Sequence, residues 1–97
     1  MPAPTDTDRV LPAPDVLSRT LDGEAVLLDL ASGRYFGLNE VGTRVWELLG
    51  AGKSVAEIRE ALLGEFDVPA DVLERDVSEL LDALRARGLV RPAPGDP

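Results

Sequence analysis

The sequence offers few side chains that could perform catalysis. It contains no cysteine and no histidine, so it lacks thiol nucleophiles, thiolate metal ligands and the usual general base near neutral pH. Carboxylates at helical spacing, such as Asp76 and Glu79, could bind a metal ion or act as an acid–base pair. They belong to an acidic run that also includes Asp71, Glu74 and Asp82, and in an amphipathic helix such residues mainly form the solvated side. We therefore expect no enzymatic activity and no cofactor.

The composition indicates one small acidic domain. The 97 residues include 18 acidic and 10 basic side chains, which gives a formal net charge of −8 at pH 7. Nucleic-acid binding depends on neutralising phosphates, so this charge argues against DNA or RNA as a partner. The glycines match no phosphate-binding loop, and no apolar run approaches the roughly 20 residues of a membrane span. We expect a cytoplasmic protein that contacts neither nucleic acid nor membrane and whose favoured partner is a polypeptide.

Hydrophobic alternation and turn residues predict a first β-hairpin. Residues 1–14 are rich in proline and short polar residues, so we expect a disordered N-terminal tail. Val16–Leu21 and residues 24–30 are predicted strands, joined by a two-residue turn at Asp22 and Gly23. The face expected to pack on the core carries Leu17, Arg19, Leu21, Glu24, Val26, Leu28 and Leu30.

A third predicted strand, residues 34–38, follows a turn that ends at Gly33. A three-residue turn would place Phe36 opposite Leu28 and facing the core, with Tyr35 on the other face. A two-residue turn would exchange Tyr35 and Phe36 between the faces, and both registers stay open at this point. Two successive hairpins give the strand order 1-2-3, so the third strand has one partner and one free edge.

Three helices are predicted after the strands. Asn39 is a suitable N-cap for the first helix, and Gly42 is expected to give clearance to a neighbouring element. Ser54 and Glu57 have the capping-box spacing at the start of the second helix. The third helix is predicted over residues 70–87. Its central apolar stripe is Leu73, Val77, Leu80 and Leu84, with Leu81 beside it.

Together these elements predict an α+β domain over residues 15–90, followed by a disordered tail at residues 91–97. The order is a three-stranded antiparallel sheet and then three helices (βββααα), which is typical of a winged helix-turn-helix-like fold. A DNA-binding version would present basic and amide side chains from its recognition helix. The third helix here carries mainly acids, so its surface does not suit DNA.

The third strand is a candidate binding edge. An exposed strand edge normally carries a charge, a proline or a covering element that blocks further pairing. The segment RYFGL, residues 34–38, is apolar after Arg34 and contains no proline. A helix or the N-terminal segment could cover this edge, and that alternative stays open. If the edge is free, an extended peptide can add to the sheet through backbone hydrogen bonds.

Several segments together resemble the PqqD-like family. The segments VLLDLASGRYFGLNEVGTRVWELL, FDV and DVSELLDALRARGLV carry the resemblance, which spans residues 21–90. Members of this family are recognition elements for ribosomally synthesised and post-translationally modified peptide (RiPP) precursors. The small acidic chain is most similar to the stand-alone members found in lasso-peptide clusters. Two departures from the family pattern are Pro69, which blurs the start of the third helix, and Gly64.

The resemblance implies a winged-helix-like fold without catalytic activity of its own. Such proteins bind the leader of a precursor peptide as a fourth strand, beside the third strand and against the third helix. They deliver it to a separate leader peptidase, a cysteine protease, and an ATP-dependent cyclase then acts on the core peptide. The peptide-binding residues carried over by position and helical spacing are Arg34, Tyr35, Phe36, Gly37, Leu38, Val72, Asp76, Val77, Leu80, Ala83, Leu84 and Arg87.

Two other functions stay open at this level. The protein could be an accessory peptide chaperone for a radical-SAM maturase, which neighbouring genes would reveal. It could also be an acidic winged-helix regulator, which a mobility-shift assay with DNA would reveal. The side of the third helix that faces the peptide is not fixed by the sequence.

Overall fold

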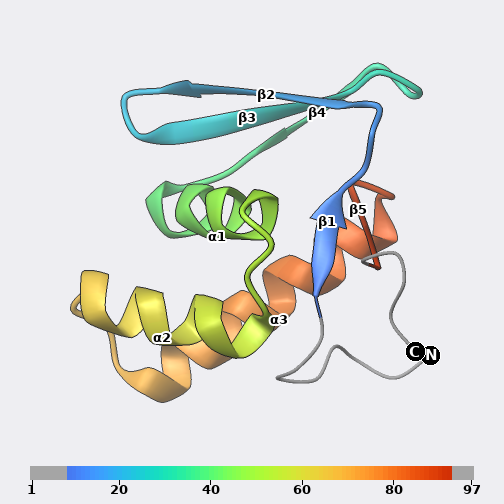
Figure 1. The fold of residues 1–97 in the computed structure, drawn as a ribbon. Coiled ribbons are helices and arrows are strands. Elements are labelled where there is room, and N and C mark those ends of the chain that lie inside the picture. The colour runs from blue at the N-terminus through green and yellow to red at the C-terminus, as the bar shows by residue number, and fades with distance from the viewer. Residues whose placement is uncertain (1–8, 93–97) are drawn as a thin grey trace.

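The computed structural model describes residues 9–92. In this range the elements are β1 (Val10–Pro12), β2 (Val16–Leu21), β3 (Glu24–Asp29), β4 (Arg34–Gly37), α1 (Glu40–Gly50), α2 (Val55–Glu65), α3 (Ala70–Ala86) and β5 (Val90–Pro92). β2, β3 and β4 form an antiparallel sheet in that order, α1 lies directly under it, and α2 and α3 lie beyond α1 (Figure 1). The fold is α+β, with the predicted three strands followed by three helices. Among the described helices, none combines the length and the hydropathy needed to cross a membrane.

The strands β1 and β5 join the two ends of the described chain. They pair antiparallel, with Leu11 opposite Arg91, and both Val10 and Val90 are buried. The prediction of a disordered tail over residues 1–14 is therefore wrong for β1, and the predicted C-terminal tail overlaps the last two residues of β5. Three-residue strands are too short to show a period, and their pairing is non-local. The predicted tail residues 1–8 and 93–97 lie outside the described range.

The sheet packs on α1 through the face opposite to the predicted one. Ala25 and Leu27 are 2% and 0% exposed, whereas Leu17 and Leu21 are 56% and 64% exposed. The prediction favoured the face with more apolar side chains. Instead, α1 packs on the other face, where the small side chain of Ala25 allows close approach. The N–H of Ala25 donates a hydrogen bond to Thr43 Oγ1 at 2.8 Å. The residues wrongly assigned to the core face therefore lie on the outer face: Leu17, Arg19, Leu21, Glu24, Val26 and Leu28. Leu30, which was assigned to the same face, lies in the loop after β3 and is exposed.

The register of β4 differs by one residue from the predicted one. The loop between β3 and β4 has four residues, 30–33, so Phe36 lies opposite Leu27 and Tyr35 opposite Leu28. The face of β3 was also wrongly predicted, and the two errors cancel. Phe36 packs against the core as expected, and Tyr35 is 68% exposed on the outer face.

The side chain of Asp29 sets the length of this loop. Its Oδ1 accepts from the N–H of Ala31 at 3.1 Å, and its Oδ2 accepts from the hydroxyl of Ser32 at 2.8 Å. The backbone O of Asp29 also accepts from the N–H of Gly33 at 2.7 Å. An Asp that bonds the backbone two residues on closes a turn locally. These bonds therefore account for a loop longer than either predicted turn.

The predicted helix starts are confirmed. Asn39 Oδ1 accepts from the N–H of Gly42 at 2.8 Å, and Ser54 and Glu57 form a reciprocal capping box. A Cβ added at Gly42 would lie 3.3 Å from both Asn39 Oδ1 and Leu38 Cδ2. Gly42 thus gives clearance to the residues that lead into its own helix, and not to a neighbouring element as predicted.

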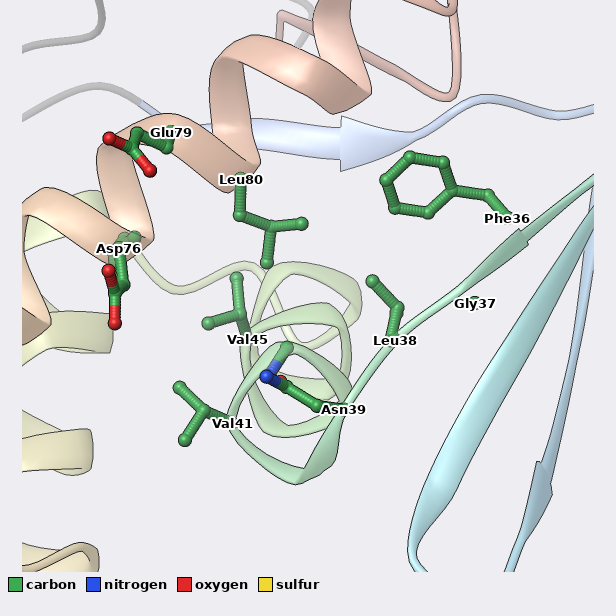
Figure 2. Close-up of a pocket in the computed structure, with 11 residues that line it drawn as sticks. Phe36, Gly37, Leu38, Asn39, Val41, Val45, Asp76, Glu79 and Leu80 are labelled. Atoms are coloured by element: carbon green, nitrogen blue, oxygen red, sulfur yellow. The ribbon is translucent and has the colours of Figure 1, made fainter.

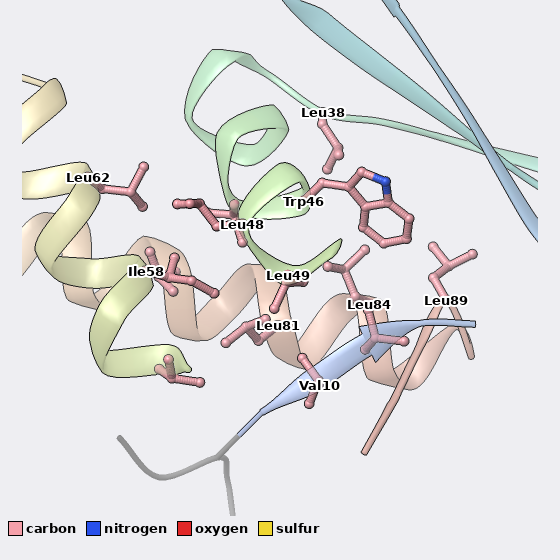
Figure 3. Close-up of a cluster of buried hydrophobic side chains, with 14 of the residues drawn as sticks. Val10, Leu38, Trp46, Leu48, Leu49, Ile58, Leu62, Leu81, Leu84 and Leu89 are labelled. Atoms are coloured by element: carbon pink, nitrogen blue, oxygen red, sulfur yellow. The ribbon is translucent and has the colours of Figure 1, made fainter. Parts of the chain in front are cut away.

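The buried stripe of α3 is rotated relative to the predicted one. Its fully buried members are Leu73, Val77, Leu81 and Leu84. Leu80, which was predicted to be central, is only half-buried. In Figure 3, Leu81 projects into the same cluster as Leu49 of α1 and Val10 of β1. Leu80 instead lines the space between α3 and β4.

Candidate functional site

A groove lies between β4 and α3. Its larger part is a cavity of about 460 Å³. The lining residues are Phe36, Gly37, Leu38, Asn39, Val41, Gly42, Val45, Asp76, Val77, Glu79 and Leu80. Figure 2 shows Phe36 and Leu38 on one wall, Leu80 on the facing wall, and Val41 and Val45 of α1 between them. The floor of the cavity is therefore apolar, and two carboxylates lie on its α3 wall.

The groove continues past Phe36 toward the start of β4. A second cavity, of about 340 Å³, is lined by Asp29, Ser32, Arg34, Tyr35, Phe36, Ala86, Arg87 and Leu89. The guanidinium carbon of Arg87 lies 5.0 Å from the centroid of the Phe36 ring, within the range of a cation–π interaction. Phe36 lines both cavities, so it lies between the two halves of one groove.

The outer edge of β4 presents backbone groups that lack a partner. The N–H of Leu38 donates to the O of Ala25 at 2.8 Å, which identifies this pair as hydrogen-bonded. Such pairs alternate along an antiparallel ladder, so Phe36 bonds toward β3 whereas Tyr35 and Gly37 point away from it. Within residues 9–92, β4 pairs with no strand other than β3, and none of the backbone hydrogen bonds outside the regular helices and strands uses these two amides. An added strand would pair with them.

The predicted site residues fall into three groups. The larger cavity is lined by Phe36, Gly37, Leu38, Asp76, Val77 and Leu80. The smaller cavity is lined by Arg34, Tyr35, Phe36 and Arg87. The remaining three, Val72, Ala83 and Leu84, line neither cavity. Leu84 is buried in the core, whereas Val72 and Ala83 are half-buried on α3.

Sequence reasoning missed the contribution of α1 and one acid of α3. Val41 and Val45 line the larger cavity, and their spacing of four residues already places them on one face of the first helix. Glu79 was assigned to the solvated side of the third helix. It lies three residues after Asp76, and residues at this spacing are neighbours on a helix surface. The helical spacing that placed Asp76 at the site therefore also favours Glu79.

The ionisable groups with shifted pKa values lie outside the groove. The Arg44 guanidinium donates to both carboxylate oxygens of Glu65, at 2.8 and 3.0 Å. This bond lowers the pKa of Glu65 and raises the pKa of Arg44. Hydrogen bonds from the backbone and side chain of Ser54 lower the pKa of Glu57. These groups join α1 to α2 and cap α2, so their role is structural.

A small α+β domain with a free strand edge beside a helix is thus the class that the fold and the groove define. The family model for Coenzyme PQQ synthesis protein D (PqqD) matches residues 24–90. The chain belongs to the PqqD family, which confirms the resemblance inferred from its sequence. The match includes β4, α1 and α3 and therefore every wall of the groove. No curated protein matches the chain.

Two solved structures are similar to this chain over most of both lengths. One is TbiB1 in complex with the TbiA(beta) leader peptide, which is 39% identical, with a TM-score of 0.76 and coverage of 90% of this chain and 98% of that chain. The other is a lasso peptide synthetase B1 complexed with the leader peptide. It is 30% identical, with a TM-score of 0.77 and coverage of 87% and 99%.

Proposed function

We propose that this protein binds the leader of a ribosomally made precursor peptide as a strand added to β4. The observation that carries the proposal is the pair of outward-facing backbone positions, Tyr35 and Gly37, beside a groove walled by α3. Strand addition takes its affinity from such backbone groups and its specificity from pockets for alternate side chains. The two similar structures hold leader peptides, which supports a leader peptide as the ligand.

The size of the groove is consistent with a moderate affinity for the leader peptide. Alternate side chains of an added strand point to the same face, so two or three would enter the apolar groove. Each buried apolar side chain contributes about 1.5–3 kcal/mol, and ordering a flexible segment costs about 2–5 kcal/mol. Backbone hydrogen bonds offset part of that cost. We expect a dissociation constant between micromolar and high nanomolar.

The bound leader would then be passed to other proteins. We place this protein in lasso-peptide biosynthesis, where it presents the leader to a separate cysteine peptidase before an ATP-dependent cyclase acts on the core peptide. A role without catalysis agrees with a chain that has neither cysteine nor histidine. The sheet and helices would form a variant of the winged helix-turn-helix arrangement, used for a peptide instead of DNA.

Fluorescence polarisation tests the proposal. The probe is the fluorescein-labelled leader of the precursor encoded beside this chain, and saturable binding is expected. Tyr35→Pro removes one outward N–H and should weaken binding at least about 10-fold, whereas Tyr35→Val keeps that N–H and serves as its control. Proline is tolerated on an edge strand where the N–H faces outward, so the variant should fold.

A second pair of variants makes the test independent of the tyrosine side chain. A Cβ added at Gly37 would meet no atom within 4 Å, so Gly37→Ala should bind as the wild type does, while Gly37→Pro should not. Circular dichroism verifies that each variant is folded. Absence of saturable binding to the wild type, or normal binding by both folded proline variants, would refute strand addition.

A further inference from the structure

The two halves of the groove carry opposite charges. Asp76 and Glu79 lie on the wall of the larger cavity. Both are exposed, and within the described part of the chain neither is paired with a cation. Arg34 and Arg87 lie at the other end, in the smaller cavity. The groove is therefore acidic beside the end of β4 and basic beside its beginning.

One carboxylate also lies at the basic end, and it is already engaged. Asp29 lines the smaller cavity, but its two oxygens accept from Ala31 and Ser32. Arg87 is positioned over the Phe36 ring, which keeps its guanidinium at the groove. The basic end thus offers two guanidinium groups to an incoming acid.

The spacing of these charges matches an extended peptide. Residues 79 and 87 are eight positions apart on α3, which corresponds to about 12 Å along a helix. An extended strand covers that distance in about four residues. Side chains four residues apart point to the same face of a strand, so one peptide can direct a charged side chain to each end of the groove.

We propose that the groove selects leader peptides by the order of their charges. The sheet is antiparallel throughout, and a strand added in the same sense would run opposite to β4. The selected segment then has Lys or Arg first, at Asp76 and Glu79. Apolar residues follow over the floor, and Asp or Glu comes about four residues after the cation, at Arg34 and Arg87. This inference rests on the proposed strand addition and specifies the peptide that is added.

The expected effect is moderate because the charges are exposed. Exposed ion pairs contribute about 0.2–1 kcal/mol each, which corresponds to about 1.4-fold to 5-fold in affinity for each pair. A peptide with the two charges in the preferred order should bind about 10-fold more tightly than one with the charges exchanged. Apolar contacts and backbone hydrogen bonds would contribute equally to the affinity of both peptides.

Selection from a randomised library of 12-residue peptides displayed on phage tests this inference. The wild type should enrich peptides with a basic residue about four positions before an acidic one. Asp76→Lys combined with Glu79→Lys should lose the preference for the basic residue and favour an acid there. Glu60→Lys combined with Asp82→Lys changes the net charge equally at exposed positions outside the groove, so it should select as the wild type does.

Three outcomes would overturn the inference. They are enriched peptides without a charge order, the same order selected by the Asp76 and Glu79 variant, and a change of order in the control variant. Each leaves strand addition intact if the labelled leader still binds in the polarisation assay. A library without any enriched peptide also overturns the inference, and the proposed function fails with it only if the labelled leader does not bind.

Discussion

At the scale of single residues, Leu80 and Leu81 show how the helix separates binding from stability. Successive residues of an α-helix point about 100° apart, since one turn takes 3.6 residues. Leu81 is 1% exposed and belongs to the core. Leu80 is half-buried and lines the larger cavity. Two adjacent leucines in one helix should therefore have different effects when each is shortened.

Leu80→Ala should weaken leader binding about 10-fold with a small change in the free energy of unfolding. Its side chain contacts the groove, and about 1.5 kcal/mol of apolar burial on binding would be lost. Leu81→Ala should instead lower the free energy of unfolding by about 2–5 kcal/mol, because it leaves a cavity in the core. Urea denaturation and fluorescence polarisation measure the two effects. If Leu81→Ala weakened binding and Leu80→Ala lowered stability, Leu81 and not Leu80 would face the groove.

The residues that face the groove were only partly predictable. The sequence identified residues 34–38 as a candidate binding edge and included Asp76, Leu80 and Arg87 among the peptide-binding residues. It did not fix the side of the third helix that faces the peptide. It did not reveal that Tyr35 and Gly37 are the outward backbone positions. That fact depends on the register of β4, which the side-chain bonds of Asp29 set through the length of the loop.

At the scale of elements, the sheet has one face for packing and one apolar face toward solvent. Leu27 is buried under α1, whereas Leu21 is 64% exposed. Leu27→Ala should therefore destabilise the protein by about 2–5 kcal/mol. Leu21→Thr should change stability by no more than about 0.5 kcal/mol, as is usual at the surface. Thermal and urea unfolding of the two variants check this. A large loss of stability with Leu21→Thr would indicate that the face predicted from the sequence is the one that packs on the core.

The contact between α1 and α2 should make stability depend on pH. Arg44 lowers the pKa of Glu65 below its ordinary value of 4.5. The contribution of this pair is therefore complete above about pH 4.5, the unfolded value, and is lost as the pH falls through the lower folded pKa. Urea unfolding at pH 7 and at pH 3 should show a smaller difference for Glu65→Gln than for the wild type. An unchanged difference would mean that the pair does not contribute in solution.

Helices were easier to predict than sheet faces for a physical reason. The starts of α1 and α2 depend on Asn39, Ser54 and Glu57, whose bonds reach only three residues along the chain. The face of β3 that becomes buried depends on which element packs against the sheet. The prediction chose the other face of β3, but the small side chain of Ala25 allows α1 and its Thr43 to approach the sheet closely.

At the scale of the whole molecule, β1 and β5 bring the two ends of the described chain together. Val10, Leu89 and Val90 are all buried in the common core, and the N–H of Ala13 donates to the O of Leu89 at 2.9 Å. The N-terminal segment was predicted to be a tail because it is rich in prolines and short polar residues. A three-residue strand is too short to show a periodic pattern among them. This pairing also contacts α3 through β5.

The central claim is that a leader peptide adds to β4 as a strand, and amide hydrogen exchange by NMR tests it most directly. The amides of Tyr35 and Gly37 point outward in the free protein and should exchange rapidly. Saturation with the leader should slow exchange at both, whereas Phe36, already bonded toward β3, serves as the internal control. Unchanged exchange at Tyr35 and Gly37 in the saturated complex would contradict strand addition.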